Sequence, residues 1–269
     1  MANKLGQHFN LHSHTARCGH ASGADEDYVR EAILAGFDVL GFSDHIFLPR
    51  LSQPGMRGDY DELDDYLHSI ETLQKKYEGK IKIYKAFEAE WLDKRFEPYY
   101  RELLETGTVD YLIIGQHCYF DHGFHWYGSS PYPTEATKAY LEDLLEGMRS
   151  GLFLYVAHPD LFMQWHKVFD AQAYQVAEAI AKLSKEMDIP LEVNMGPSRW
   201  WHGGNIDKRL LPYPNHQFWE VVARIGSPCV IGVDAHDPRD YRTSDYEFFR
   251  TFVEELGLKM VDPSLKLKK

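Results

Sequence analysis

Apolar and polar residues form two kinds of pattern along this chain. Short continuous apolar runs, flanked by polar or glycine residues, are typical of strands buried on both faces of a parallel sheet. Such runs predict strands over Gln7–His12, Val39–Ser43, Lys80–Phe87, Tyr111–Gly115, Phe153–Ala157, Leu191–Asn194 and Cys229–Val233. Between them, apolar residues recur at three- and four-residue spacing, which predicts amphipathic helices.

The clearest helical pattern lies over Tyr60–Tyr77, where Leu63, Leu67, Ile70 and Leu73 share one face. Other helices are expected over Ala24–Ala35, Arg95–Glu105, Thr134–Ser150, Ala171–Met187, Gln217–Ile225 and Tyr246–Leu256. Long loops without regular structure are expected over residues 46–58, 118–133 and 195–214.

Strands that alternate with helices predict an α/β fold in which right-handed crossovers build a parallel sheet. Seven such units, with no linker or low-complexity stretch between them, favour a closed or nearly closed barrel over a doubly wound sheet. We therefore expect a single domain over residues 1–269. No Gly-x-Gly-x-x-Gly motif follows a strand, so nothing indicates a dinucleotide-binding fold.

The composition of the chain indicates which binding partners and which cellular compartment to expect. The formal net charge is −12 with histidine neutral, which argues against a basic face for the phosphate backbone of nucleic acid. The cysteines at positions 18, 118 and 229 are odd in number and widely spaced, as suits a reducing cytoplasm. There is no leader-like N-terminal stretch and no apolar run long enough to span a membrane. We expect a cytoplasmic protein with no membrane partner.

Histidine and carboxylate side chains gather where the predicted strands end. Parallel strands of a barrel all point their carboxyl ends to one face, where active sites are built. Neutral imidazole is a common ligand for zinc, iron and similar ions. The pattern therefore predicts a metal site with nine ligands: His12, His14, His20, His45, Glu88, His117, His158, Asp234 and His236.

Nine donors exceed the needs of one or two ions, because a catalytic zinc takes about three protein ligands. Three divalent ions fit this number. Two close ions can hold a nucleophilic hydroxide, and a third can stabilise a charged oxygen, which points to phosphoester hydrolysis. Glu90 competes with Glu88 as a ligand, because strand alternation puts both on one face. Asp44 is expected to orient a neighbouring ligand rather than bind metal itself.

At these residues the chain resembles the PHP (polymerase and histidinol phosphatase) family. The resemblance is carried by His12-Ser13-His14 with His20, Ser43-Asp44-His45, Glu88, His117, His158 and Gly232-Val233-Asp234-Ala235-His236. It implies a distorted (β/α)7 barrel with a trinuclear centre of zinc, iron or manganese. It also implies three ligand sets: His12, His14, Glu88 and Asp234; Glu88, His117 and His158; His20, His45 and His236.

Within the family the chain is similar to the histidinol-phosphatase branch. The likeness lies in Cys18-Gly19-His20-Ala21, in Glu192-Val193-Asn194 followed by Arg199, and in Leu211-Pro212-Tyr213-Pro214. It departs from the branch at Met195-Gly196-Pro197-Ser198 and at Gln116. The resemblance implies a small phosphorylated metabolite as substrate, with L-histidinol phosphate first. Another small phosphate such as a nucleotide or a cyclic phosphodiester, an amidohydrolase reaction, and a non-catalytic metal protein are the alternatives.

Further roles fall on polar residues near these ligands. Arg199 is the first candidate for a phosphate clamp, because a guanidinium pairs with phosphate through parallel hydrogen bonds, and Arg17 is the second. Asp160 could protonate the leaving group or support His158. His202 could contact phosphate or protonate the leaving group. Tryptophans in the loops are expected to wall the pocket: Trp126, Trp165, Trp200 and Trp201.

Overall fold

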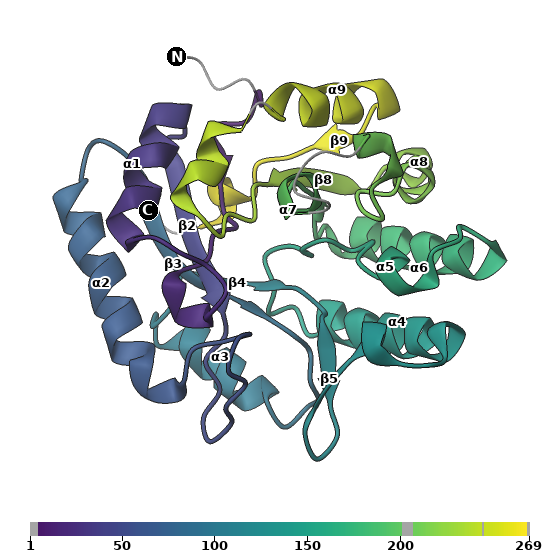
Figure 1. Cartoon of the computed structure of the whole chain (residues 1–269), viewed down its shortest axis with the longest axis horizontal. Helices are drawn as coiled ribbons and strands as arrows, with labels where there is room; N and C mark the ends of the chain where they lie inside the picture. Colours follow the sequence, from purple (N-terminus) through teal and green to yellow (C-terminus); the bar gives the residue numbers. More distant parts are fainter. Residues whose placement is uncertain (1–4, 201–206, 244, 268–269) are drawn as a thin grey trace.

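The strands of this protein lie at the centre, with helices around them (Figure 1). A computed structural model of the chain describes residues 5–200, 207–243 and 245–267. Four parallel strands run in the order β1 (Phe9–Asn10), β2 (Val39–His45), β3 (Lys82–Ala89) and β4 (Tyr111–Ile114). Three more run in the order β7 (Leu191–Asn194), β8 (Pro228–Gly232) and β9 (Lys259–Met260). Together they form a curled parallel sheet.

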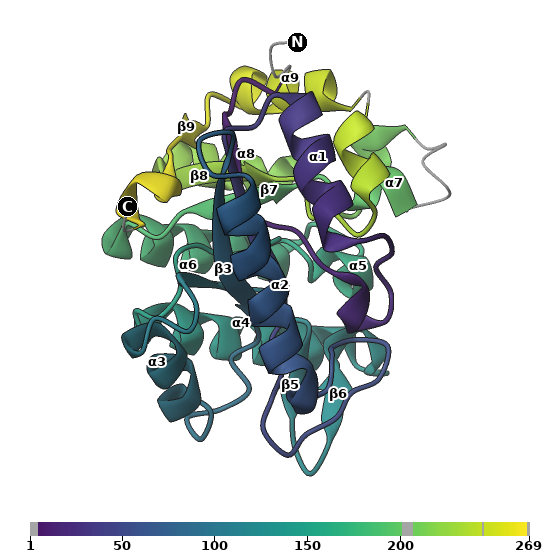
Figure 2. The same cartoon turned by 90° about the vertical axis from the view of Figure 1, so that its left-hand side faces the viewer.

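The helices cover the outer face of this sheet and bury the larger part of the apolar core against it. They are α1 (Asp25–Ala35), α2 (Leu63–Lys76), α3 (Glu97–Glu105), α4 (Pro133–Arg149), α5 (Met163–His166), α6 (Ala171–Met187), α7 (Pro197–Trp200), α8 (His216–Ile225) and α9 (Tyr246–Leu256). Figure 2 shows α1 and α2 side by side over the outside of the first strands. Within the described ranges we find no helix whose length and hydropathy would let it cross a bilayer.

The two runs of strands are linked on both sides. On one side Val156 forms parallel bridges to Ile114 and to Leu191. On the other side Ser13 bridges to Ala235, and the amide of His14 donates to the Ala235 carbonyl at 2.9 Å. The first and last parts of the chain therefore meet at the carboxyl ends of the strands.

Alternate residues on the strands face the inside of the curl and pack there as a second, smaller apolar cluster. On β3 these are Tyr84 and Ala86, and on β4 they are Tyr111 and Ile113. Because side chains alternate with a period of two, the next inward position on β3 is Glu88. The inward side chains of the sheet thus change from apolar to polar at the carboxyl ends of the strands, where the site lies.

Several expected elements differ in the structure, and one of the expected loops, residues 195–214, contains the short helix α7. Residues 153–157 are predicted as a strand, but only isolated bridges at Val156 form there. Residues 118–133 are predicted as an irregular loop, whereas the structure has a hairpin of β5 (Cys118–Phe120) and β6 (Phe124–Trp126). Strands of three residues are too short to show a two-residue period, and the many aromatic residues of this segment hide the alternation.

Candidate metal centre

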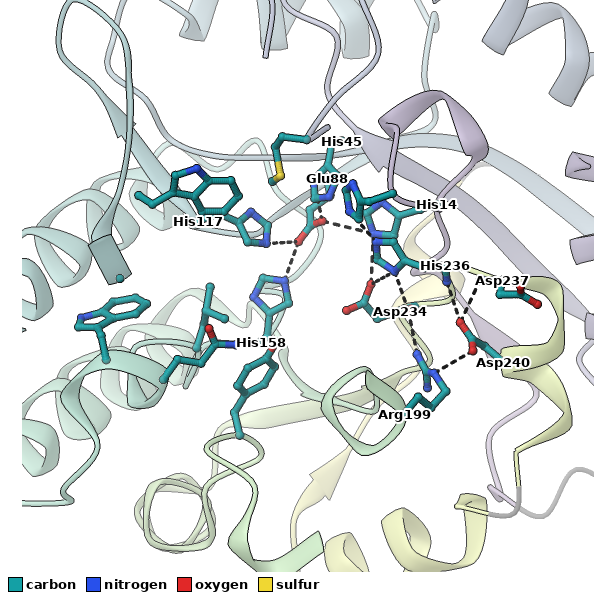
Figure 3. Close-up of a pocket in the computed structure, with 18 of the residues that line it drawn as sticks. His14, His45, Glu88, His117, His158, Arg199, Asp234, His236, Asp237 and Asp240 are labelled. Atoms are coloured by element: carbon teal, nitrogen blue, oxygen red, sulfur yellow. Dashed lines mark hydrogen bonds and ion pairs between the residues drawn. The ribbon is translucent and has the colours of Figure 1, made fainter. Parts of the chain in front are cut away.

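Glu88 lies at the centre of the predicted ligands, fully buried at the end of β3. Each of its two carboxylate oxygens faces a different group of the surrounding imidazoles. Glu88 Oε1 lies 2.8 Å from Nε2 of His158 and 3.6 Å from Nε2 of His117. Its Oε2 lies 3.5 Å from Nε2 of His12, 3.5 Å from Nε2 of His14 and 3.3 Å from Nδ1 of His45. Figure 3 shows His117 and His158 on one side of this carboxylate and His14 and His45 on the other.

Asp234 brings a second carboxylate to the same group from the segment after β8. Its Oδ1 lies 3.4 Å from Nε2 of His12, 3.2 Å from Nε2 of His14 and 3.4 Å from Nδ1 of His236. Nε2 of His236 is 3.0 Å from Nε2 of His20. All nine side chains predicted as ligands therefore gather at one place, although they come from opposite ends of the sequence.

The donor atoms of this group fit metal ions. Ring nitrogens and a carboxylate oxygen are buried there without a hydrogen-bond partner among the described residues: Nε2 of His12, both ring nitrogens of His14, Nδ1 of His45, Nδ1 of His158 and Oδ1 of Asp234. Buried polar atoms without a partner are costly, and coordination to cations would satisfy them. Several overlapping sets have the spacing of a metal site, among them His12, His14 and Asp234, then His12, Glu88 and His158, then His14, His45 and His236.

The electrostatics of the group agree with this chemistry. Burial alone would raise the pKa of Glu88 and Asp234, but the surrounding imidazoles hold the pKa of both well below its usual range. Burial and the nearby His14 lower the pKa of His45 and His236 well below its ordinary value. Ionised carboxylates and neutral imidazoles are the forms that bind metal.

His14 and His12 each lie beside three carboxylates, and their pKa shifts in the opposite direction. Burial lowers the pKa of His14, but the adjacent carboxylates of Asp234, Asp44 and Glu88 raise it to about 9. The pKa of His12 rises well above its ordinary value, because Glu192, Asp234 and Glu88 outweigh its burial. These two rings hold protons that bound cations would displace.

Three of the imidazoles also have a carboxylate beside Nδ1, the ring nitrogen that faces away from Glu88. Glu192 Oε1 lies 2.8 Å from Nδ1 of His12, Glu90 Oε1 lies 3.1 Å from Nδ1 of His117, and Asp44 Oδ1 lies 3.4 Å from Nδ1 of His14. Such partners fix the orientation and tautomer of a ligand ring. The structure thus separates the two glutamates that spacing could not: Glu88 contacts the ligand rings at their centre, and Glu90 lies behind one of them. The orienting position expected for Asp44 is also found.

Sequence reasoning missed the place of Glu192. Its other oxygen accepts a hydrogen bond from the amide of His158 at 3.2 Å and from the side chain of Asn194 at 2.8 Å. It is separated from His12 by most of the chain, so no local pattern links the two. A signal was available on the next strand, because a Cβ at Gly232 would lie 1.7 Å from Glu192 Oε1, and glycine there leaves room for this carboxylate.

The group opens into a cleft of about 850 Å³. Trp126 and Trp165 line it, as expected, together with Met56 and Tyr213. On another side lies Arg199, whose guanidinium donates to the backbone carbonyls of Val233 and Asp234 and lies 3.2 Å from a carboxylate oxygen of Asp240. Figure 3 shows Arg199 and Asp240 together, apart from His117 and His158.

Two predicted site residues are not brought to the cleft. The Arg17 guanidinium pairs instead with Asp65 at 2.7 Å and Asp25 at 2.9 Å, and lines a separate surface hollow. Asp160 is buried and accepts from the Asn215 amide at 2.6 Å and the Trp219 indole at 3.0 Å. Burial raises its pKa to about 7 against these hydrogen bonds. The predicted roles of His202, and the predicted wall position of Trp201, lie outside the described residues.

A curled parallel α/β sheet with a cluster of imidazoles and carboxylates at its carboxyl ends defines a protein built around a site for several metal ions. The chain belongs to the PHP domain family, whose sequence model matches residues 10–196. This match ends before Asp234 and His236, which the structure places in the same cluster as the matched ligands.

Similar proteins are histidinol-phosphatases by name. A probable histidinol-phosphatase from Deinococcus radiodurans is 28% identical over 239 residues, which cover 84% of this chain and 85% of that protein. The histidinol-phosphatase of Bacillus subtilis is 25% identical over 257 residues, covering 85% and 93%. A crystal structure of histidinol phosphate phosphatase from Lactococcus lactis, complexed with zinc, L-histidinol and phosphate, has a TM-score of 0.73 at 20% identity and covers 97% of this chain and 98% of that one. This last likeness establishes the shared fold.

Proposed function

We propose that this protein is a metal-dependent phosphatase that hydrolyses L-histidinol phosphate to L-histidinol and phosphate. The observation that carries the proposal is the gathering of nine imidazole and carboxylate side chains, several with buried atoms that lack partners, in a chain of the PHP family. The names of the similar proteins, and the zinc, L-histidinol and phosphate in the Lactococcus lactis structure, support this substrate.

The two Glu88 oxygens support an assignment of ligands to three ions. His12, His14, Glu88 and Asp234 would hold one ion, and Glu88, His117 and His158 a second. His20, His45 and His236 would hold the third. Zinc, iron and manganese are all compatible with a nitrogen-rich donor set of this kind. When bound, such ions supply Lewis-acid stabilisation of the charge on a phosphoryl group.

The protein's own side chains would place the substrate. Arg199 is held at the cleft edge by the Val233 and Asp234 carbonyls and by Asp240, so it presents a cation of fixed position for the phosphate. Trp126 and Trp165 also line the cleft and offer flat apolar surface to an imidazole ring. We propose no general acid from Asp160, because it does not line the cleft and its Oδ2 accepts from the Asn215 amide and the Trp219 indole.

The same proposal covers the architecture. The bridges of Val156 to Ile114 and Leu191 support counting residues 153–157 as the strand between β4 and β7, which gives a distorted (β/α)7 barrel. The Ser13–Ala235 bridge and the bond from Gln7 Nε2 to the Ile231 carbonyl at 2.7 Å support one domain over residues 1–269. The cytoplasmic location stays a prediction.

The test is phosphate release from L-histidinol phosphate by the metal-loaded protein, beside an aryl phosphate, a nucleotide and a cyclic phosphodiester. We expect histidinol phosphate to give the highest kcat/KM. The variant His14→Ala should lose metal and turnover together. Arg199→Ala should keep its metal and lose turnover by about 100- to 1,000-fold, the usual loss for one charge-stabilising donor. A higher kcat/KM for another phosphate would move the assignment to that substrate, and activity in fully metal-free protein would overturn the proposal.

A further inference from the structure

A buried arginine stands behind one of the proposed metal ligands. Arg57 belongs to the long segment between β2 and α2, yet its side chain is completely buried. Its Nη2 donates to Glu90 Oε2 at 2.9 Å, its Nη1 to the Ile46 carbonyl at 3.0 Å, and its Nε to Gln53 Oε1 at 2.9 Å. Each nitrogen of the guanidinium therefore has a partner, and the whole group is fixed in one orientation.

Glu90 is held between this arginine and a ligand ring. Its Oε2 faces Arg57, and its Oε1 faces Nδ1 of His117 at 3.1 Å, while Nε2 of His117 points toward Glu88. An ionised carboxylate only accepts hydrogen bonds. The ring of His117 must then carry its proton on Nδ1, which leaves the Nε2 lone pair directed into the proposed centre.

The support of His117 differs from that of the other rings with a carboxylate behind them. The hydrogen bonds of Glu192 are completed by the His158 amide and the Asn194 side chain. Asp44 is likewise completed by the hydroxyl of Thr15 and the amide of His45. Among these three carboxylates and within the described residues, only Glu90 pairs with an arginine or lysine, and that partner comes from a segment without regular structure.

Stabilisation of the fold alone does not explain why a buried Arg57–Glu90 ion pair is present. Taking two charges out of water costs about as much as their attraction returns, and apolar residues of similar size often do as well. An ion pair that fixes the tautomer and direction of a ligand has a function that apolar residues cannot replace. We infer that Arg57 and Glu90 are positioning residues, and that they act through His117 on the binding of one metal ion, the ion shared by Glu88, His117 and His158. This inference rests on the proposed metal centre and not on the identity of the substrate.

The sharpest variant replaces both partners, Arg57→Met with Glu90→Leu. It leaves no unpaired buried charge, so we expect the metal-free protein to fold and to melt close to the wild type. Chelator competition with Zn²⁺, and separately with Mn²⁺, should show one ion bound about 10- to 100-fold more weakly, the usual effect of losing a partner behind a ligand. The other ions should bind as in the wild type. Glu90→Gln should weaken the same ion.

A second measurement reads His117 directly, without metal or substrate. Ring ¹⁵N chemical shifts of the metal-free wild type should show the His117 proton on Nδ1, and the double variant should show both tautomers. The control is Lys85→Met on β3, which removes the 2.7 Å pair of Lys85 with Glu71 of α2 and should change neither reading.

The outcomes separate the two proposals. Unchanged affinities with an unchanged His117 tautomer in the double variant and in Glu90→Gln would overturn this inference and leave the proposed function standing. Equal weakening of every ion would also overturn it, because it would show a general loosening of the site. A wild-type protein that binds no metal would instead remove the proposed centre itself.

Discussion

Gly115 and Gly232 stand at inward positions directly beside the buried carboxylates Glu88 and Glu192. Each follows inward apolar residues on its own strand, such as Ile113 before Gly115, so any side chain here would point into the site. The lack of a Cβ is therefore what lets each carboxylate reach the imidazoles. The positions of Glu88 and Glu192 therefore depend on the neighbouring glycines as well as on the glutamates themselves.

Gly115→Ala is expected to displace Glu88, because the new Cβ would lie 1.8 Å from Glu88 Oε1. Overpacking of this kind costs about 1–3 kcal/mol of stability, and a ligand moved by about 1 Å can cost about 100-fold in turnover. Metal content and kcat measured on purified protein test this. Gly123→Ala is the control, since nothing lies within 4 Å of a Cβ at that position, and equal effects in both variants would refute the explanation.

The gathering of the predicted ligands and the orienting position of Asp44 could be predicted from sequence, whereas the places of Arg57 and Glu192 could not. Most of these residues lie at or just after a predicted strand, so the barrel rule places them on the shared face, whereas His20 follows a short 3-10 helix. Arg57 and Glu192 act through contacts with residues far away in the chain, and no periodicity records such contacts. Arg17 shows the reverse case: it lies between two ligands in sequence, yet its side chain pairs with Asp25 and Asp65.

Among the elements, the β5–β6 hairpin and α4 are joined by one hydrogen bond near the cleft. The hydroxyl of Tyr127, just after β6, donates to the carboxylate of Asp143 on α4. The same hydroxyl accepts from the side chain of Gln116 at 2.9 Å. The hairpin carries Trp126 of the cleft wall, so this contact helps to hold that wall against the helix.

Asp143 makes this contact sensitive to pH. Burial raises its pKa to about 6, Glu146 and Glu142 add to the rise, and the bond from Tyr127 opposes it. A carboxyl whose pKa is higher in the folded state stabilises that state when protonated. This contribution is complete below the unfolded pKa of about 3.9 and is lost as the pH rises through 6.

The variant Asp143→Asn stays neutral and can still accept from Tyr127. We expect it to match the wild type near pH 4 and to become more stable than the wild type by pH 7. The difference should be on the order of 1 kcal/mol, because solvent screens this partly exposed side chain. Urea unfolding of both proteins in chelator at several pH values measures it. A difference that does not grow with pH would show that burial of Asp143 has no such cost.

For the molecule as a whole, the segments that close the curled sheet also carry the proposed metal ligands. Side chains fill the seam between β1 and β8, where Gln7 and Asn10 bond to the backbone of Ile231 and Val233. The alternation of strands and helices, and the shared face of the ligands, follow from sequence. The irregular backbone of residues 153–157 could not be predicted from sequence. Only Val156 bridges to the neighbouring strands there, and this depends on the curvature of the whole sheet.

Removal of metal should therefore destabilise the entire fold. An ion present at 100 times its Kd adds about 2.7 kcal/mol when it binds only the folded state, which is about 5–10 °C in melting temperature for a chain of this size. We expect dialysis against a chelator to lower the melting temperature by at least this amount, and added Zn²⁺ or Mn²⁺ to restore it. His14→Ala should respond less. An unchanged melting temperature after complete metal removal would show that the cluster does not stabilise the fold.

The bridge between Ser13 and Ala235 also bears on how the protein is made. The first donors, His12 and His14, leave the ribosome early, but Asp234 and His236 are added only when most of the polypeptide has been synthesised. A nascent chain cannot offer its full donor set before that point. Under the proposed ligand assignment, a product that ends before Asp234 could offer the donors of only one of the three ions, the set Glu88, His117 and His158.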